Sequence, residues 1–379
     1  MHNQTHATRT PLWQGLALLT GSVLVFAICA EIVARLAVPY SGTPRYLAQA
    51  DQGMGYRLTP GFVGREREAE FDTHIRINSK GFRDTEVPRA GADRKIVGLG
   101  DSFTFGAGVA FEETYLAKLE QQLNTSGVPT AISKQGIPGF NIEQESRLLE
   151  ETLAKDHYDL ILLGFGLNDV TDIQRKMTVS SGYLVSANPT NIQSMLKNIL
   201  IHSAFVRYVY YRLRQNNVAL YWLEKSGFRQ DSSKQEHPMS ESLQTYAPSQ
   251  LQRWRTAGDA FERIRQLSQQ HHAELIVLYL PYNFEVYPMI AGRIQHQLGF
   301  HEQDMDIDKG RKTLAELCQR GGVPFLDLTI PLRQYAVHYP DSMLYYPING
   351  HWTKTGHALA ASILFKGLLH HLETSKQHP

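Results

Sequence analysis

The sequence predicts an α/β domain built on one five-stranded parallel sheet and preceded by a membrane-spanning helix. Three observations predict this arrangement. The first is an uncharged apolar run near the N-terminus. The second is an alternation of buried-strand runs with helical segments from residue 94 onward. The third is a set of polar or glycine-rich turns that directly follow several of those strands.

The composition is that of an ordinary folded protein. Lys and Arg together number 38 against 37 Asp and Glu, and 42% of the residues are hydrophobic. Neither a polybasic nucleic-acid-binding protein nor an acidic disordered chain has this balance, so we expect no nucleic-acid partner. The only two cysteines, Cys29 and Cys318, exclude a disulfide framework and a cysteine-based metal site.

Residues 12–38 predict a transmembrane signal anchor, which follows an N-terminal tail of residues 1–11. The apolar run is long enough to cross a bilayer. A cleaved signal peptide is the alternative, but the run exceeds the usual length of such peptides and residues 26–30 make a poor cleavage site. Arginines lie on both sides of the segment, so charge alone does not set its orientation.

The rest of the chain divides into three expected parts. Residues 39–55 predict a linker, residues 56–93 a β-rich lead-in with a hairpin, and residues 94–372 the main domain, which carries a helical insert at 172–247. The aromatic side chains of a helix in the insert are expected to serve packing, and the alternative is that the insert forms a lid or a wall of a substrate groove. The expected strands of the domain are 95–100, 130–134, 160–164, 274–280 and 324–328, and its expected helices are 113–124, 142–155, 248–271, 308–320 and one beginning at 355.

A serine stands at the end of the first expected strand of the sheet. Gly100-Asp101-Ser102 closes this strand and precedes a helix, so the Ser102 hydroxyl is expected in the crevice at the carboxyl ends of the strands. The spacing of the surrounding glycines fits neither a dinucleotide fingerprint nor a P-loop, because Phe103 and Phe105 occupy the positions that need glycine. Taken alone, Gly-Asp-Ser is weak evidence, because an ordinary capped strand-to-helix turn is the commoner source of such a sequence.

The next two strands end in turns that offer hydrogen-bond donors to the same crevice. Gly136-Ile-Pro-Gly139 frees backbone N–H groups, and Asn168 adds a side-chain amide. The backbone N–H groups of Ser102 and Gly139 and the Asn168 amide would together form an oxyanion hole for acyl transfer. A general base is expected in a loop near the C-terminal end of the domain. His351 is the favoured base, because it lies between the last expected strand and the final expected helix. We interpret His357 and His338 as structural.

With these blocks assembled, the sequence resembles the SGNH, or GDSL, hydrolase family. Ser102, Gly139, Asn168 and His351 occupy in order the family's places for nucleophile, two oxyanion donors and base, with Asp101 supporting the nucleophile. The resemblance implies a flavodoxin-like sheet of strand order 2-1-3-4-5 with helices on both faces. The flanking sequence is similar to that of membrane-tethered bacterial members linked to cell-surface polysaccharide O-acyl chemistry. This implies a single-pass protein of the bacterial inner membrane with a periplasmic domain.

The sequence departs from the family pattern at one position, because Asn349 stands where an aspartate usually orients the catalytic histidine. Three interpretations follow. His351 and Ser102 could act as a dyad aided by Asn349, as in Cys-His-Asn enzymes. A substitute carboxylate, Asp327 or Asp341, could fill the third position. The site could also have lost catalysis.

The expected function is therefore a serine-dependent acyl-ester hydrolase, an esterase or deacetylase, that acts on an acylated carbohydrate or another small ester. The alternatives are a polysaccharide O-acetyltransferase that uses the same site and a non-catalytic polysaccharide-binding or assembly protein. The sequence implies no cofactor and no metal. The acidic run at 304–308 lacks the glycine and glutamate of a calcium loop.

Overall fold

The structure of the protein is a computed structural model, which describes residues 12–37, 49–68, 70–86, 91–180, 183–187, 192–200, 202–214 and 237–375. The expected N-terminal tail and most of the expected linker lie outside these residues. The main domain contains one five-stranded parallel sheet of order β6-β5-β7-β10-β11. If only the strands of this sheet are numbered, in the order in which they occur along the chain, this is the order 2-1-3-4-5. The predicted α/β class and strand order are therefore confirmed. The strands are β5 (Arg94–Gly100), β6 (Thr130–Gly136), β7 (Leu160–Phe165), β10 (Glu274–Tyr279) and β11 (Phe325–Asp327).

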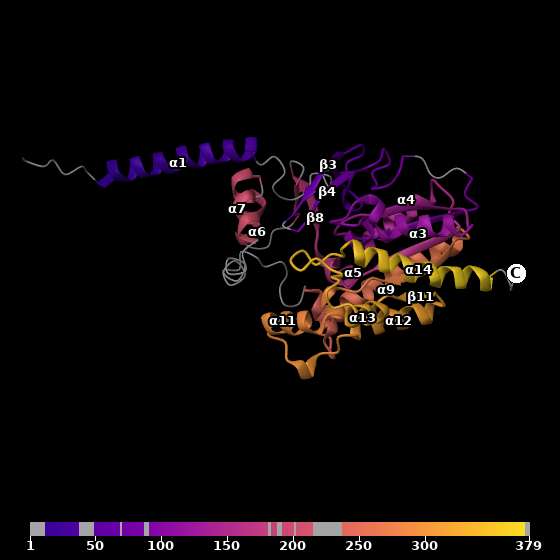
Figure 1. The fold of residues 1–379 in the computed structure, drawn as a ribbon. Coiled ribbons are helices and arrows are strands. Elements are labelled where there is room, and N and C mark those ends of the chain that lie inside the picture. The colour runs from indigo at the N-terminus through magenta and orange to yellow at the C-terminus, as the bar shows by residue number, and fades with distance from the viewer. Residues whose placement is uncertain are drawn as a thin grey trace, which may run out of the picture.

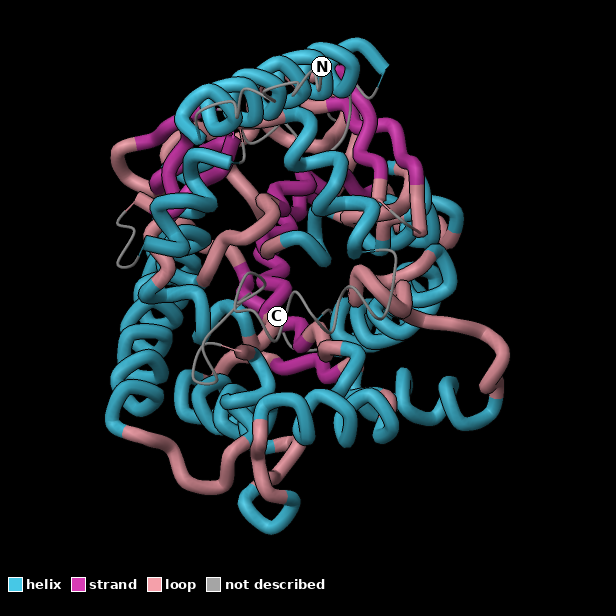
Figure 2. Tube along the Cα trace, turned by 90° about the vertical axis from the view of Figure 1, so that its left-hand side faces the viewer, coloured by secondary structure: helices cyan, strands magenta, loops and turns pink. Residues whose placement is uncertain are grey.

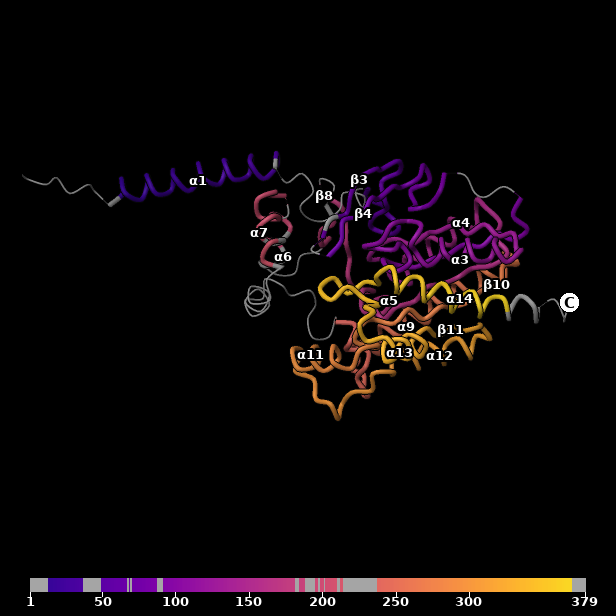
Figure 3. Tube along the Cα trace, viewed as in Figure 1, coloured from indigo at the N-terminus to yellow at the C-terminus, as the bar shows by residue number. Residues whose placement is uncertain are grey.

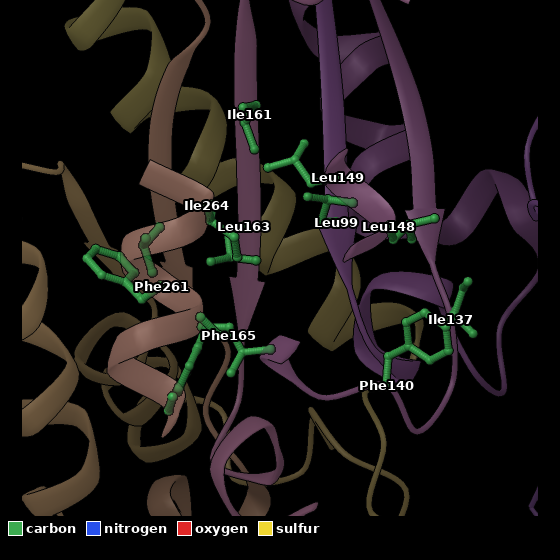
Figure 4. Packing of buried hydrophobic residues seen from close by; sticks show 14 of the residues in the cluster. Leu99, Ile137, Phe140, Leu148, Leu149, Ile161, Leu163, Phe165, Phe261 and Ile264 are labelled. Atoms are coloured by element: carbon green, nitrogen blue, oxygen red, sulfur yellow. The ribbon is translucent and has the colours of Figure 1, made fainter. Parts of the chain in front are cut away.

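Helices cover both faces of the sheet, because nearly every position of its central strands is apolar and both faces need burial. Figure 2 shows the strands running through the middle of the domain with helices around them. Leu99 and Leu163 point to one face, where they meet residues such as Leu148 and Ile264, as Figure 4 shows. Helices α4 (Ile142–Leu153), α9 (Pro248–Gln270) and α12 (Lys309–Gly321) supply that core, and α3 (Tyr115–Thr125), α13 (Thr329–His338) and α14 (Lys354–Ser375) supply the other.

Short helices follow the carboxyl ends of the strands at one edge of the sheet. Helix α2 (Ser102–Phe105) comes directly after β5, and α5 (Asn168–Thr171) follows β7. Helices α10 (Asn283–Val286) and α11 (Pro288–Leu298) follow β10. Because the strands are parallel, all of these turns lie at the same edge, where α/β proteins place their ligand sites.

The lead-in consists of two short hairpins that pack against this domain. Strands β1 (Gln49–Asp51) and β2 (Gly55–Arg57) pair antiparallel, as do β3 (Val63–Arg67) and β4 (Asp72–Arg76). Strand β1 falls within the range expected to be linker, since three residues with no apolar alternation leave no strand signal in the sequence.

The segment expected to be a helical insert holds strands as well as helices. It contains the hairpin β8 (Met177–Ser180) and β9 (Tyr183–Ser186), followed by α6 (Ile192–Leu200) and α7 (Ala204–Arg214). Its last part is a buried turn over Pro238–Ser242 whose Glu241 carboxylate accepts hydrogen bonds from Arg253 and Trp254 of α9.

Helix α1 (Leu12–Ala37) contains an apolar stretch, Trp13–Leu36, of mean hydropathy 2.3, long enough to cross a membrane. Figures 1 and 3 show α7 beside the C-terminal end of α1. The Glu31 carboxylate accepts hydrogen bonds from the backbone N–H groups of Ala204 (3.0 Å) and Phe205 (3.0 Å), so a side chain of α1 caps the first turn of α7. The rings of Phe26 and Phe205 also meet edge to face.

Candidate active site

Ser102 is the first residue of α2 and is held by the turn that precedes it. The Asp101 carboxylate accepts a hydrogen bond from the Phe103 N–H (2.8 Å) and so caps the helix. Gly100 has φ +151°, and a Cβ there would lie 2.1 Å from the Thr104 hydroxyl oxygen and 3.0 Å from the carbonyl oxygen of Gly164. Only glycine therefore lets the chain turn sharply enough to present Ser102 at the end of the strand.

The structure brings Ser102, His351 and Asn349 into one hydrogen-bonded row. His351 Nε2 lies 2.7 Å from Ser102 Oγ, and His351 Nδ1 lies 2.5 Å from Asn349 Oδ1. An amide oxygen only accepts hydrogen bonds, so Nδ1 carries the ring proton. Nε2 is then free to accept the serine proton, which is the tautomer that a general base for Ser102 requires.

The imidazole of His351 sits among aromatic side chains that disfavour its charged form. The Phe103 ring lies with its centroid 5.2 Å from that of His351, and Trp352 is fully buried beside Phe103. Burial lowers the pKa of His351 to about 4, and the neutral Asn349 amide offers no opposite charge to raise it. His351 is therefore neutral at pH 7.

Asn168 and Asp101 form a second buried pair behind the nucleophile. Asn168 Nδ2 donates a hydrogen bond of 2.7 Å to the Asp101 carboxylate, and both side chains are buried. Burial raises the pKa of Asp101, while its hydrogen bonds to Phe103 and Asn168 lower it. The amide nitrogen carries two hydrogens, and Asp101 accepts one of them.

Gly139 lies in the turn after β6, the strand next to β5. Its φ of +77° is a conformation that favours glycine, and a Cβ would lie 2.8 Å from the Tyr56 hydroxyl. That hydroxyl donates a hydrogen bond to the carbonyl oxygen of Pro138 (2.9 Å), which fastens the turn to the lead-in. Ser102, Gly139 and Asn168 thus follow three adjacent strands of the sheet.

The other residues considered for the third position have different surroundings. Asp327 pairs with Arg311 (2.7 Å) and accepts a hydrogen bond from the Thr329 N–H. Asp341 is exposed. Asn349 is therefore the predicted candidate that the structure places against Nδ1.

The two remaining histidines of interest are in positions that suit structural roles. His357 is buried, and its Nδ1 accepts a hydrogen bond from the Tyr115 N–H (3.3 Å) while its ring stacks on Tyr115. Burial lowers the pKa of His357 to about 3. His338 is exposed at the end of α13.

Sequence reasoning missed three acidic residues close to the site. Glu70, in the β3–β4 hairpin, binds backbone N–H groups of the loop that carries His351. Glu145 and Asp169 are buried near Asp101, and burial raises the pKa of both carboxyls. Asp169 follows Asn168 and accepts a hydrogen bond from the Gly166 N–H (2.7 Å), so only its place in the motif gave a signal. Glu70 and Glu145 lie in ordinary polar stretches and gave none.

The acidic run at 304–308 is engaged by cations of the chain itself. Asp306 pairs with Lys312 and Asp308 with Arg311 and Arg333. Across the described ranges, no cluster of three or more His, Cys, Asp or Glu side chains has the arrangement of a metal site.

Comparison with known proteins places this geometry in a family. Residues 99–359 match the profile of the GDSL-like lipase/acylhydrolase family. Similar solved structures include the acetyl xylan esterase AlAXEase (15% identity, TM-score 0.40, 72% of this chain and 98% of that chain). They also include the psychrotrophic esterase EstA from Pseudoalteromonas sp. (10% identity, TM-score 0.39, 74% of this chain and 100% of that chain). A third is a catalytic mutant of Axe2, an acetylxylan esterase from Geobacillus stearothermophilus (12% identity, TM-score 0.41, 73% of this chain and 94% of that chain).

No curated protein matches the chain in sequence. The family profile nevertheless spans well over half of the chain, from the end of β5 into α14. It covers the turns that carry Ser102, Gly139, Asn168 and His351, and the sequence had predicted this family from the same four residues. The chain belongs to the GDSL-like lipase/acylhydrolase family, also called SGNH hydrolases.

Proposed function

We propose that this protein is a serine-dependent acyl-ester hydrolase in which Ser102 is the nucleophile and His351 the general base. The observation that carries the proposal is the hydrogen-bonded row from Ser102 Oγ to His351 Nε2 and from His351 Nδ1 to Asn349 Oδ1, at 2.7 and 2.5 Å. This row supports a site that is assembled for proton transfer before any substrate binds.

The reaction proceeds in two halves that share one set of residues. Ser102 Oγ attacks the ester carbonyl carbon while His351 Nε2 takes the hydroxyl proton. The negative oxygen of the tetrahedral intermediate accepts hydrogen bonds from the N–H groups of Ser102 and Gly139 and from the Asn168 amide. His351 returns its proton to the departing alcohol, which leaves an acyl-enzyme. Water, activated by the same histidine, then releases the acid and restores Ser102.

Asn349 sets the expected efficiency of this reaction. Its amide holds the imidazole in the correct tautomer, but it has no charge to stabilise the imidazolium that forms when His351 accepts the proton. In a serine protease, replacing the orienting aspartate by asparagine costs about 10⁴ in kcat because the wrong tautomer results. Here the amide oxygen faces Nδ1, so the tautomer is correct and only the charge is missing. We therefore expect measurable but modest ester turnover.

Hydrolysis of p-nitrophenyl acetate by the purified full-length protein tests this proposal. Ser102→Ala and His351→Ala should each lower kcat by about 10³ or more, because each removes a group that takes part in bond formation or proton transfer. Exposed residues of the same types provide the controls, and Ser79→Ala and His338→Ala should leave turnover unchanged. Turnover that survives Ser102→Ala would refute the assignment. Product analysis with a carbohydrate acceptor present separates hydrolysis from transfer to a sugar hydroxyl.

The expected substrate class is an acylated carbohydrate or another small ester, and we place its hydrolysis outside the cytoplasm. In this proposal α1 remains attached as a single membrane anchor in the bacterial inner membrane, with residues 55–379 on the periplasmic side. The contact of Glu31 with the first turn of α7 supports retention of α1, because removal of the helix would leave those backbone N–H groups without their cap.

A further inference from the structure

The β3–β4 hairpin reaches the loop that carries the candidate base. Glu70 lies between the two strands of this hairpin, and its carboxylate accepts hydrogen bonds from the backbone N–H groups of Ile348 (3.0 Å) and Asn349 (2.7 Å). Two consecutive N–H groups of the loop therefore bind one carboxylate. Such charge-assisted bonds are roughly twice as strong as bonds between neutral groups.

The hairpin is itself fixed against the loop, so Glu70 is held in place. The Phe71 ring, which is buried, packs on the Tyr346 ring with centroids 5.1 Å apart. The hydroxyl groups of Thr73 and Tyr346 both donate to the carbonyl oxygen of Gly108, at 3.0 and 2.9 Å. Hairpin and loop thus share an anchor on the main domain, and Glu70 adds a direct connection between them.

The loop that Glu70 binds is a tight turn closed by its own backbone hydrogen bonds. Gly350 has φ +85°, its N–H donates to the Tyr346 carbonyl (2.9 Å), and the Tyr346 N–H donates to the His351 carbonyl (2.8 Å). Asn349 is part of this turn and is half-buried. Its backbone N–H is bound by Glu70, while its side chain binds His351.

We propose that Glu70 is a positioning residue for the active site. By binding the Asn349 backbone N–H, Glu70 holds the Asn349 side-chain carboxamide against His351 Nδ1. It thereby takes over part of the orienting function of the missing aspartate. This inference rests on the proposed serine-hydrolase function. It follows that the lead-in hairpin is part of the active site, although it precedes the residues that match the family profile. The uncharged Asn349 side chain orients the His351 ring by its position alone. A fixed position of residue 349 therefore matters more here than it would with an aspartate.

Steady-state kinetics of the full-length protein with p-nitrophenyl acetate test the inference. Glu70→Ala should lower kcat roughly 10- to 100-fold with KM nearly unchanged, because small misplacements of catalytic groups cost this much. Glu70→Gln keeps one acceptor oxygen and should lose less. Asp72→Asn is the matched control, because it removes a carboxylate of the same hairpin that pairs with Arg65 instead. A Glu70→Ala protein with unchanged kcat would overturn the inference.

A double-mutant cycle asks whether Glu70 acts through Asn349. In an Asn349→Ala background, Glu70→Ala should add less than about a twofold further loss, because the positioned side chain is already absent. An equal loss in both backgrounds would show that Glu70 acts by another route, and so would contradict the proposal.

The titration of His351, followed by NMR of histidine-labelled protein, gives a readout that does not depend on turnover. In Glu70→Ala the pKa of His351 should rise from about 4 toward the ordinary value, because a loosened loop admits water to the ring. An unshifted titration would refute the positioning role even in a protein without activity. If the wild-type protein lacked Ser102-dependent turnover while the titration shifted, the proposed function alone would fail.

Discussion

The pair of Asn349 and His351 separates two roles that one aspartate usually combines. The amide oxygen selects the ring tautomer, whereas nothing at that position stabilises the imidazolium. Burial among aromatic rings then lowers the pKa of His351 to about 4. The sequence predicted five candidate site residues, because each lies in a motif that can be identified from the residues around it: Ser102, Gly139, Asn168, Asn349 and His351. Glu70 could not be predicted, because it lies in an ordinary polar stretch with no motif and meets Asn349, 279 positions away, only in the folded chain.

The dependence of kcat/KM on pH should report this low pKa. His351 acts as a base only when it is neutral, so kcat/KM should be flat from about pH 5 to pH 8 and fall as the pH decreases through about 4. The measurement is kcat/KM for phenyl acetate between pH 3.5 and 8, with circular dichroism at each pH to show that the protein stays folded. A midpoint at pH 6.5 or above would contradict the environment assigned to His351.

Asn349→Asp should make the enzyme faster. A carboxylate of nearly the same shape would stabilise the imidazolium by about 1.4 kcal/mol for each unit by which it raises the pKa of His351. We expect a higher kcat with little change in KM, and an acid limb of the pH profile displaced to higher pH. Asp327→Asn and Asp341→Asn are the controls. If Asn349→Asp brings no gain while either control loses activity, another residue holds the third position.

At the scale of elements, the site depends on how closely α2 approaches β6. A Cβ at Gly136 would lie 2.3 Å from the Phe105 nitrogen and 2.6 Å from the Thr104 carbonyl carbon. Both contacts are with backbone, so the helix that begins with Ser102 would have to move. The sequence predicted β6 as a short strand at 130–134, but it predicted neither α2 as a separate helix nor this contact, which depends on the packing of two backbones.

Gly136→Ala should therefore harm stability and activity together. Overpacking of this kind costs about 1–3 kcal/mol of unfolding free energy, and the displaced α2 should also lower kcat. Gly258→Ala is the matched control in α9, where the nearest atom to a new Cβ, in the Leu317 side chain, lies 3.8 Å away. It should stabilise the protein by about 0.5–1 kcal/mol. Thermal unfolding checks both, and equal Tm values for the two variants would contradict the packing argument.

The whole molecule combines a fold that the sequence predicts well with contacts that it does not reveal. Alternating strands and helices predicted the parallel sheet, and the family resemblance implied its order. The β8–β9 hairpin was missed because each strand is only four residues long and the expectation for the whole insert followed its later helical part. The capping of α7 by Glu31 joins residues 173 and 174 positions apart, a separation that no local pattern reports.

Membrane orientation is a prediction at this scale. A fluorescent protein that matures only in the cytoplasm, fused after Pro379, should leave cells dark if residues 55–379 face the periplasm. The same fusion on a chain that lacks residues 1–38 should give bright cells and serves as the control. A bright full-length fusion would refute the orientation.

The central claim is that Ser102 is an activated nucleophile, and its covalent labelling by a fluorophosphonate probe tests that claim most directly. Attack by Ser102 Oγ displaces fluoride and needs the same proton transfer to His351 as the ester reaction. Mass spectrometry should locate the label on Ser102 in the wild-type protein, with slower labelling in His351→Ala and none in Ser102→Ala. A folded wild-type protein that takes up no label, or a label that persists in Ser102→Ala, would contradict the claim.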